Sequence, residues 1–118
     1  MACHINSAET PGNYAAIFHD ARSRGGKRLA EMIVEQLDLL PELAGHTRVR
    51  AASSDRYDRP YSTIKGIWPG PGNISGVCLE PAFINNPSHA SLLTHEGLER
   101  VGRAISVGVI GWIDEGGQ

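Results

Sequence analysis

Glu80 is the acidic residue placed best to do chemistry. It closes residues 74–80 (Ile-Ser-Gly-Val-Cys-Leu-Glu), a short and mostly apolar run that is typical of a buried β-strand. In open α/β sheets, ligands gather outside the carboxyl ends of the strands, where a side chain can leave the core without breaking the ladder. A carboxylate there is available for acid-base chemistry. Position alone, however, does not separate a functional acid from an ordinary acid at a strand end.

The five histidines show no local spacing that would bind a metal. No two of them have the i, i+4 spacing of a zinc-binding helix or the spacing of a zinc finger. His19 lies at a strand end and His46 lies in a Gly-flanked turn, while His89 and His95 lie near helix starts. At each of these four positions the sequence favours a solvated polar residue.

Two further sets of residues could contact an anion. One is a basic run with interleaved tyrosines, in which neighbouring aspartates dilute the charge, so a solvated loop is favoured. Its members are Arg48, Arg50, Arg56 and Arg59 with Tyr57 and Tyr61, and the aspartates are Asp55 and Asp58. The other set is the glycine-rich stretches 25–26 and 70–72, which lack the spacing and trailing lysine of a phosphate-binding loop and are predicted to be turns.

Length and composition set the class of protein. The chain has 118 residues, which predicts one domain, and its 11 basic and 13 acidic side chains give a net charge of −2. Without a clustered basic excess, no nucleic-acid partner is expected. No apolar stretch reaches the roughly 18 residues of a membrane span, and no basic region followed by an apolar core marks a signal peptide. Two cysteines are too few for a disulfide framework.

The elements that must position these residues alternate between strands and helices. Residues 14–19 have the aromatic and β-branched character of a strand. Residues 27–40 repeat apolar residues at three- and four-residue steps, which predicts an amphipathic helix that ends before Pro41. Residues 47–50 alternate like a strand, but irregular backbone and a long surface loop are expected over 41–74 as a whole.

Two helical starts follow the predicted strand 74–80. Asn86 and Pro87 have the form of a helix cap followed by proline, which opens a short turn through Leu93. Thr94 can cap a longer helix that stops before Gly116. One face of this helix is predicted to carry Leu98, Val101, Ile105 and Trp112. Strands interleaved with helices predict an α/β fold, a layered sheet with flanking helices.

Two segments resemble the zinc-dependent N-acetylmuramoyl-L-alanine amidases of the Amidase_3 type, which cut peptidoglycan. Residues 4–9 (His-Ile-Asn-Ser-Ala-Glu) resemble the His-x-Asn segment of that family. Residues 77–87 (Val-Cys-Leu-Glu-Pro-Ala-Phe-Ile-Asn-Asn-Pro) resemble its strand ending in glutamate, followed by an aromatic residue and an Asn-Pro cap. The order of the strand, the helix and the final helix also agrees, so that the resemblance spans nearly the whole chain.

The resemblance implies both a fold and a reaction. The fold is a zinc-exopeptidase-like (phosphorylase/hydrolase-like) α/β domain, residues 1–118, without the opening elements of the family. The reaction is hydrolysis of the amide between N-acetylmuramic acid and L-alanine in peptidoglycan or a muropeptide. By the same resemblance, His4 is a zinc ligand, and Glu80 is the general base or electrostatic partner of a zinc-bound water. The cofactor is zinc, and the location is periplasmic or extracellular.

The number of zinc ligands leaves two alternatives open. A catalytic zinc has three protein ligands and a water molecule, and the family supplies a first histidine and a glutamate from chain that precedes the segment matching His4. Only three residues precede His4 here. The sequence therefore favours the C-terminal part of a longer amidase, and the alternative is a non-catalytic module that binds cell-wall glycopeptide or a partner chain. The oligomeric state is not predicted.

Strand parity gives a separate expectation for the cysteines. Successive side chains of a strand point to opposite faces. If His4 and Glu80 both point into one site, Cys78 shares the face of Glu80, whereas Cys3 points away. The sequence therefore predicts two free thiols, with Cys78 buried.

Overall fold

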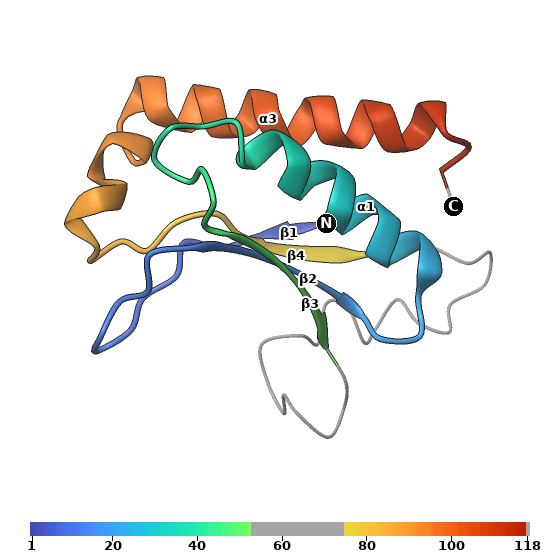
Figure 1. Ribbon diagram of the computed structural model, residues 1–118, viewed down its shortest axis with the longest axis horizontal. Coiled ribbons are helices and arrows are strands. Elements are labelled where there is room, and N and C mark those ends of the chain that lie inside the picture. The colour runs from blue at the N-terminus through green and yellow to red at the C-terminus, as the bar shows by residue number, and fades with distance from the viewer. Residues whose placement is uncertain (53–74, 118) are drawn as a thin grey trace.

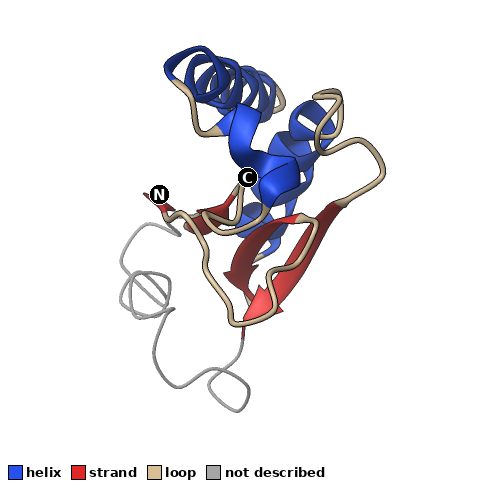
Figure 2. Ribbon diagram, turned by 90° about the vertical axis from the view of Figure 1, so that its left-hand side faces the viewer, coloured by secondary structure: helices blue, strands red, loops and turns tan. Residues whose placement is uncertain are grey.

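A four-stranded sheet with two long helices on one of its faces forms the molecule (Figures 1 and 2). The computed structural model describes residues 1–52 and 75–117. In chain order the elements are β1 (Ala2–Cys3), β2 (Ala15–Asp20), α1 (Arg24–Leu37), β3 (Thr47–Ala52), β4 (Val77–Glu80), the short 3-10 helix η1 (Pro87–Leu92) and α3 (His95–Asp114). This is the layered α/β architecture predicted from the sequence.

The sheet has the strand order β1-β4-β2-β3. β1 runs parallel to β4 and β2 runs parallel to β3, whereas the central pair β2 and β4 is antiparallel. The carboxyl ends of β1 and β4 therefore lie at the same end of the sheet as the beginnings of β2 and β3. Glu80, the last residue of β4, lies at this end.

The two faces of the sheet have separate apolar clusters because side chains alternate along each strand. Ile17 and Leu79 point toward the helices and pack in the main core with Ile33 of α1. Phe18 and Cys78 belong to a smaller buried cluster, formed by the side chains of the opposite face. Glu80 follows the parity of Cys78 and lies on this opposite face.

The helix α1 begins and ends three residues earlier than predicted. Ser23 caps it by accepting a 2.9 Å hydrogen bond from the backbone N–H of Gly26, so the glycines 25–26, predicted to be a turn, lie in its first turn. The helix ends at Leu37, and the carboxylate of the next residue, Asp38, accepts hydrogen bonds from the backbone of Gly45 and from the hydroxyl of Thr47, the first residue of β3. The helix therefore ends before Pro41, as predicted, but three residues earlier than expected.

Tertiary pairing decides the extent of the strands. The predicted strand 14–19 is confirmed as β2 with a shift of one residue. β3 takes six residues out of a stretch expected to be mainly irregular, because its backbone pairs with β2 in unbroken register from Thr47 to Ala52. β4 begins at Val77. The loop and the turn expected over 53–74 lie outside the described residues.

The C-terminal helices begin where the capping residues predict. Asn86 caps η1 and Thr94 caps α3, each accepting a backbone N–H through its side chain. The predicted face of α3 is only partly correct, since Leu98 is 48% exposed while Val101 is buried. Within the part of the chain that the structure describes, no helix has both the length and the apolar character needed to cross a membrane.

The close approach of α3 to α1 depends on a glycine, Gly108, because this position has no room for a larger side chain. A Cβ atom added at Gly108 would lie 2.6 Å from the Cα of Ile33 and 2.9 Å from its nitrogen, which are backbone atoms that cannot move aside. The two helix backbones are therefore in close contact at this point. At Gly102, an exposed position earlier in α3, an added Cβ atom would have no other atom within 4 Å.

This contact predicts opposite effects for the same substitution at two positions of one helix. Gly108→Ala should lower the free energy of unfolding by about 1–3 kcal/mol, the usual cost of overpacking. Gly102→Ala should raise it by about 0.5–1 kcal/mol, because alanine favours the helix and meets open space. Urea denaturation of the two variants measures both changes. Equal effects of the two substitutions would contradict the close helix contact.

Candidate functional site

The N-terminal segment lies in parallel register beside the end of β4. Ala2 pairs with Cys78 and Cys3 pairs with Leu79, and the backbone N–H of His4 donates to the carbonyl of Leu79 at 2.8 Å. The pairing then continues beyond both strands, where Asn6 bridges to Phe83 through hydrogen bonds of 2.8 and 2.9 Å with the neighbouring residues of that loop. This register sets His4 beside Glu80, 76 positions later in the sequence.

Glu80 has one hydrogen-bond partner among the described side chains. The Nδ2 group of Asn6 donates to its Oε2 atom at 2.9 Å. The carboxylate is half-buried, and burial raises its pKa, while the charge of His4 acts in the opposite direction. Sequence reasoning gave Asn6 no role, although its position two residues after His4 puts both side chains on one face of an extended segment.

The thiol of Cys78 lies on the same face, 3.7 Å from the Nδ1 atom of His4. Burial, reinforced by the charge of Glu80, raises the pKa of Cys78 to about 11, so it is a protonated and inert thiol at neutral pH. The residue Cys3 is exposed overall. Partial loss of solvent around its thiol raises the pKa of that thiol too. Both cysteines are free and Cys78 is buried, which confirms the expectation from strand parity.

A complete metal site is absent from the described part of the chain. No three side chains of histidine, cysteine, aspartate or glutamate within residues 1–52 and 75–117 come together so that they could hold a metal ion. His4 and Glu80 offer two donors at most, and a catalytic zinc needs three protein ligands. These residues by themselves do not fit a zinc ion, and the roles assigned to His4 and Glu80 stay predictions.

The histidines predicted to be solvated divide into two pairs. His46 and His95 are exposed, as predicted, and His95 lies 3.1 Å from Glu99 on the surface of α3. His19 and His89 are 5% and 0% exposed, so the prediction is wrong for them. Each of the buried rings has a backbone hydrogen-bond partner that residue type alone does not indicate.

His89 holds the loop that follows Glu80. Its Nδ1 atom accepts a 2.9 Å hydrogen bond from the backbone N–H of Phe83, which fixes the neutral tautomer with the proton on Nε2. That Nε2 atom is buried without a hydrogen-bond partner among the described residues. Burial lowers the pKa of His89, and the charge of His46 lowers it further.

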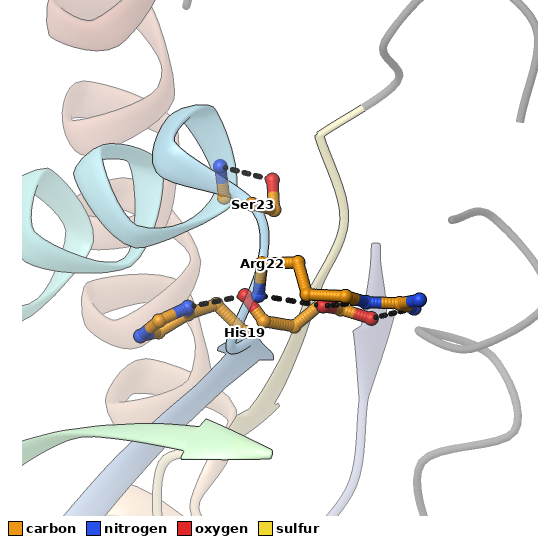
Figure 3. A network of polar contacts seen from close by, with 5 residues as sticks. His19, Arg22 and Ser23 are labelled. Carbon is orange, nitrogen blue, oxygen red and sulfur yellow. Dashed lines mark hydrogen bonds and ion pairs between the residues drawn. The ribbon is translucent and has the colours of Figure 1, made fainter. Parts of the chain in front are cut away.

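His19 belongs to a polar network at the other end of the sheet, away from Glu80 (Figure 3). Its Nδ1 atom lies 2.8 Å from the carbonyl oxygen of Asp20, and the buried Asp20 carboxylate accepts from both the backbone and the guanidinium of Arg22. The hydrogen bond from Arg22 lowers the pKa of Asp20, against the effect of burial. Together with the Ser23 cap, this network turns the chain from β2 into α1.

Comparison with known proteins identifies the kind of fold. No protein-family model and no curated protein sequence matches the chain. Among solved structures, it is similar to the CwlD amidase from Clostridioides difficile, solved in complex with the GerS lipoprotein, with a TM-score of 0.70 and 21% identity. The chain has an amidase-like fold. The similarity covers 95% of this chain and 52% of the amidase, so the chain spans about half the length of that protein.

The free thiols predict a simple labelling result. With a thiol reagent, the native chain should react at Cys3 and be protected at Cys78, and the unfolded chain should react at both without prior reduction. Cys3→Ser should leave a native protein that does not label and an unfolded protein that labels once. Absence of free thiol in the unfolded, monomeric wild type would contradict the assignment of the two cysteines to opposite faces.

The buried His89 predicts a loss of stability in mild acid. Because its pKa is lowered in the folded state, the unfolded chain takes up a proton near pH 6.5 while the folded chain does not. Its neutral form therefore contributes fully above pH 6.5, and the free energy of unfolding falls below that pH, by up to about 1.4 kcal/mol per pH unit.

Chemical denaturation between pH 7.5 and 5.0 measures this effect. His89→Gln keeps an acceptor for the N–H of Phe83 but cannot take up the proton, so its stability should decline less steeply than that of the wild type. His95→Gln, at a side chain 93% exposed, should follow the wild type. The same slope for His89→Gln and the wild type would refute the buried neutral histidine.

Proposed function

We propose that this chain is an amidase module that acts on peptidoglycan or its muropeptides at the amide between N-acetylmuramic acid and L-alanine. The observation that carries the proposal is the position of Glu80, at the carboxyl end of β4 with His4 and Asn6 beside it. Strand ends of this kind are where α/β proteins hold their ligands. The amidase-like fold supports the same reaction class.

Glu80 serves as the general base in this proposal. It takes a proton from the attacking water and passes it to the nitrogen of the leaving amine. The Asn6 amide holds one carboxylate oxygen, and the other, which accepts no hydrogen bond from the described residues, would face the water. His4, in register with Glu80, is the residue of this chain that would bind a zinc ion, and any further ligands would come from outside the described residues.

A binding module is the second candidate function. It is favoured because no three side chains of histidine, cysteine, aspartate or glutamate in the described residues come together so that they could hold a metal ion. The similar amidase was solved in complex with a lipoprotein, which is a precedent for a protein partner on this fold. In this version the face around Glu80 holds glycopeptide or a partner chain without turnover. Either function places the protein at the cell wall, in the periplasm or outside the cell.

Glu80→Gln separates the two functions. Glutamine keeps an acceptor for Asn6 but cannot take a proton, so hydrolysis should fall by about 10²- to 10⁴-fold while binding of a muropeptide changes little. Chromatography of the released stem peptide measures hydrolysis, with zinc supplied, and calorimetry measures binding. Glu99→Gln, at an exposed position of α3, should retain full activity.

Each outcome selects one reading. Turnover by the wild type that is lost in Glu80→Gln supports the amidase. Binding by both proteins without turnover by either supports the binding module. Turnover that survives Glu80→Gln would exclude Glu80 as the base, and neither binding nor turnover would refute both functions.

A further inference from the structure

A row of residues crosses the sheet on the face that carries Glu80. Glu80 pairs with Ala16 of β2, and Ala16 pairs with Arg48 of β3. Register partners in a sheet point to the same face, and neighbouring strands lie about 4.8 Å apart, so the Cα atoms of Glu80 and Arg48 are about 10 Å apart. Their shared register partner is Ala16, whose methyl side chain offers no polar group to a ligand.

Tyr14 lies between Arg48 and the loop that follows Glu80. The guanidinium of Arg48 lies over its ring, with Cζ 4.1 Å from the ring centroid, and that of Arg50 approaches the same ring at 5.9 Å. On another side the ring packs edge-on against Phe83, from the loop after Glu80, with centroids 5.1 Å apart. The aromatic pair therefore holds the arginines in a fixed position relative to the loop that carries the site.

No carboxylate among the described residues neutralises the charge of the two arginines. Within residues 1–52 and 75–117, neither guanidinium has a carboxylate partner. By contrast, Arg100 holds Glu42 through two nitrogens, which fixes a helix to a loop. Arg48 is exposed and Arg50 is partly exposed. Two positive charges are therefore presented to solvent at a site where an aromatic ring restrains their motion.

We propose that Arg48, supported by Arg50 and Tyr14, binds a free carboxylate of the peptide whose amide is placed at Glu80. A guanidinium presents a planar fork of N–H donors that matches a carboxylate, and stacking on Tyr14 leaves the edge of that fork free. An extended peptide spans about 3.3–3.6 Å per residue, so the carboxylate belongs one to three residues from the scissile amide. The substrate is therefore an acidic glycopeptide. The proposal rests on the proposed function.

Two matched ligands test the proposal. One is N-acetylmuramyl-L-alanyl-glutamic acid, and the other is the same compound with both glutamyl carboxylates amidated. The wild type should bind the acid about 10-fold more tightly than the diamide, the amount expected for a charge-assisted pair. Arg48→Gln should remove this preference by weakening binding of the acid alone. Arg103→Gln, at an exposed position of α3, makes the same change in net charge and should leave the preference intact.

Calorimetry with each ligand, and NMR shifts of the Arg48 and Glu80 signals, provide the readouts. Equal binding of acid and diamide by the wild type would overturn the carboxylate site and leave the proposed function standing. If neither ligand binds, the proposed function is wrong and the carboxylate site is wrong with it. If Arg48→Gln lowers the melting temperature but keeps the preference for the acid, the arginines are structural. Arg50→Gln replaces Arg48→Gln if the latter does not fold, and should reduce the same preference.

Discussion

The parallel pairing of residues 2–6 with residues 78–84 is the constraint on which the candidate site depends. It begins as the short strand β1 beside β4 and continues as backbone hydrogen bonds of Asn6 with the loop after Glu80. A slip of one residue would turn His4 and Asn6 to the other face of the sheet, because side chains alternate along extended backbone. The side chains of Asn85 and Asn86 hold the following residues in place by donating to the carbonyls of Ala8 and Gly12.

The two faces of the sheet have different tasks. One face packs against α1 and α3, and the close contact at Gly108 sets how near the helices lie. Ion pairs reinforce this layer at its edges, where Arg28 holds Glu115 and Arg100 holds Glu42. The other face carries Glu80, His4 and the arginines of β3. Structural charges are thus paired among the helices and loops, whereas Arg48 and Arg50 have no acidic partner in the described residues.

Histidine burial shows why residue type does not reveal role. His89 accepts a hydrogen bond from the backbone of Phe83, and Phe83 lies against Tyr14 and is bridged to Asn6. The ring therefore stabilises the loop after Glu80 without belonging to the site. A polar residue is buried only where its partner is supplied, and here the partner is a backbone group that any residue at position 83 except proline would provide. Such a partner leaves no mark in the sequence.

The sequence by itself determined that the helices exist, the caps of the two C-terminal helices and the strand character of the apolar runs, because these features depend on local chemistry. Capping side chains and the helical period act between residues a few positions apart, so the sequence correctly predicts the caps Asn86 and Thr94. Strand parity likewise predicted the two free thiols. The α/β class followed from the alternation of these elements.

Only the tertiary structure decided the strand order, the full length of β3 and which residues meet. Pairing between strands joins positions far apart in the chain, such as His4 with Glu80 and Glu80 with Arg48 through Ala16, and no local pattern encodes that choice. It also decided that Gly108, and not Leu98, faces α1, because close packing favours the smallest side chain where two backbones cross. The periodicity of a helix predicts an apolar face, but the shape of its neighbour selects which residues occupy it.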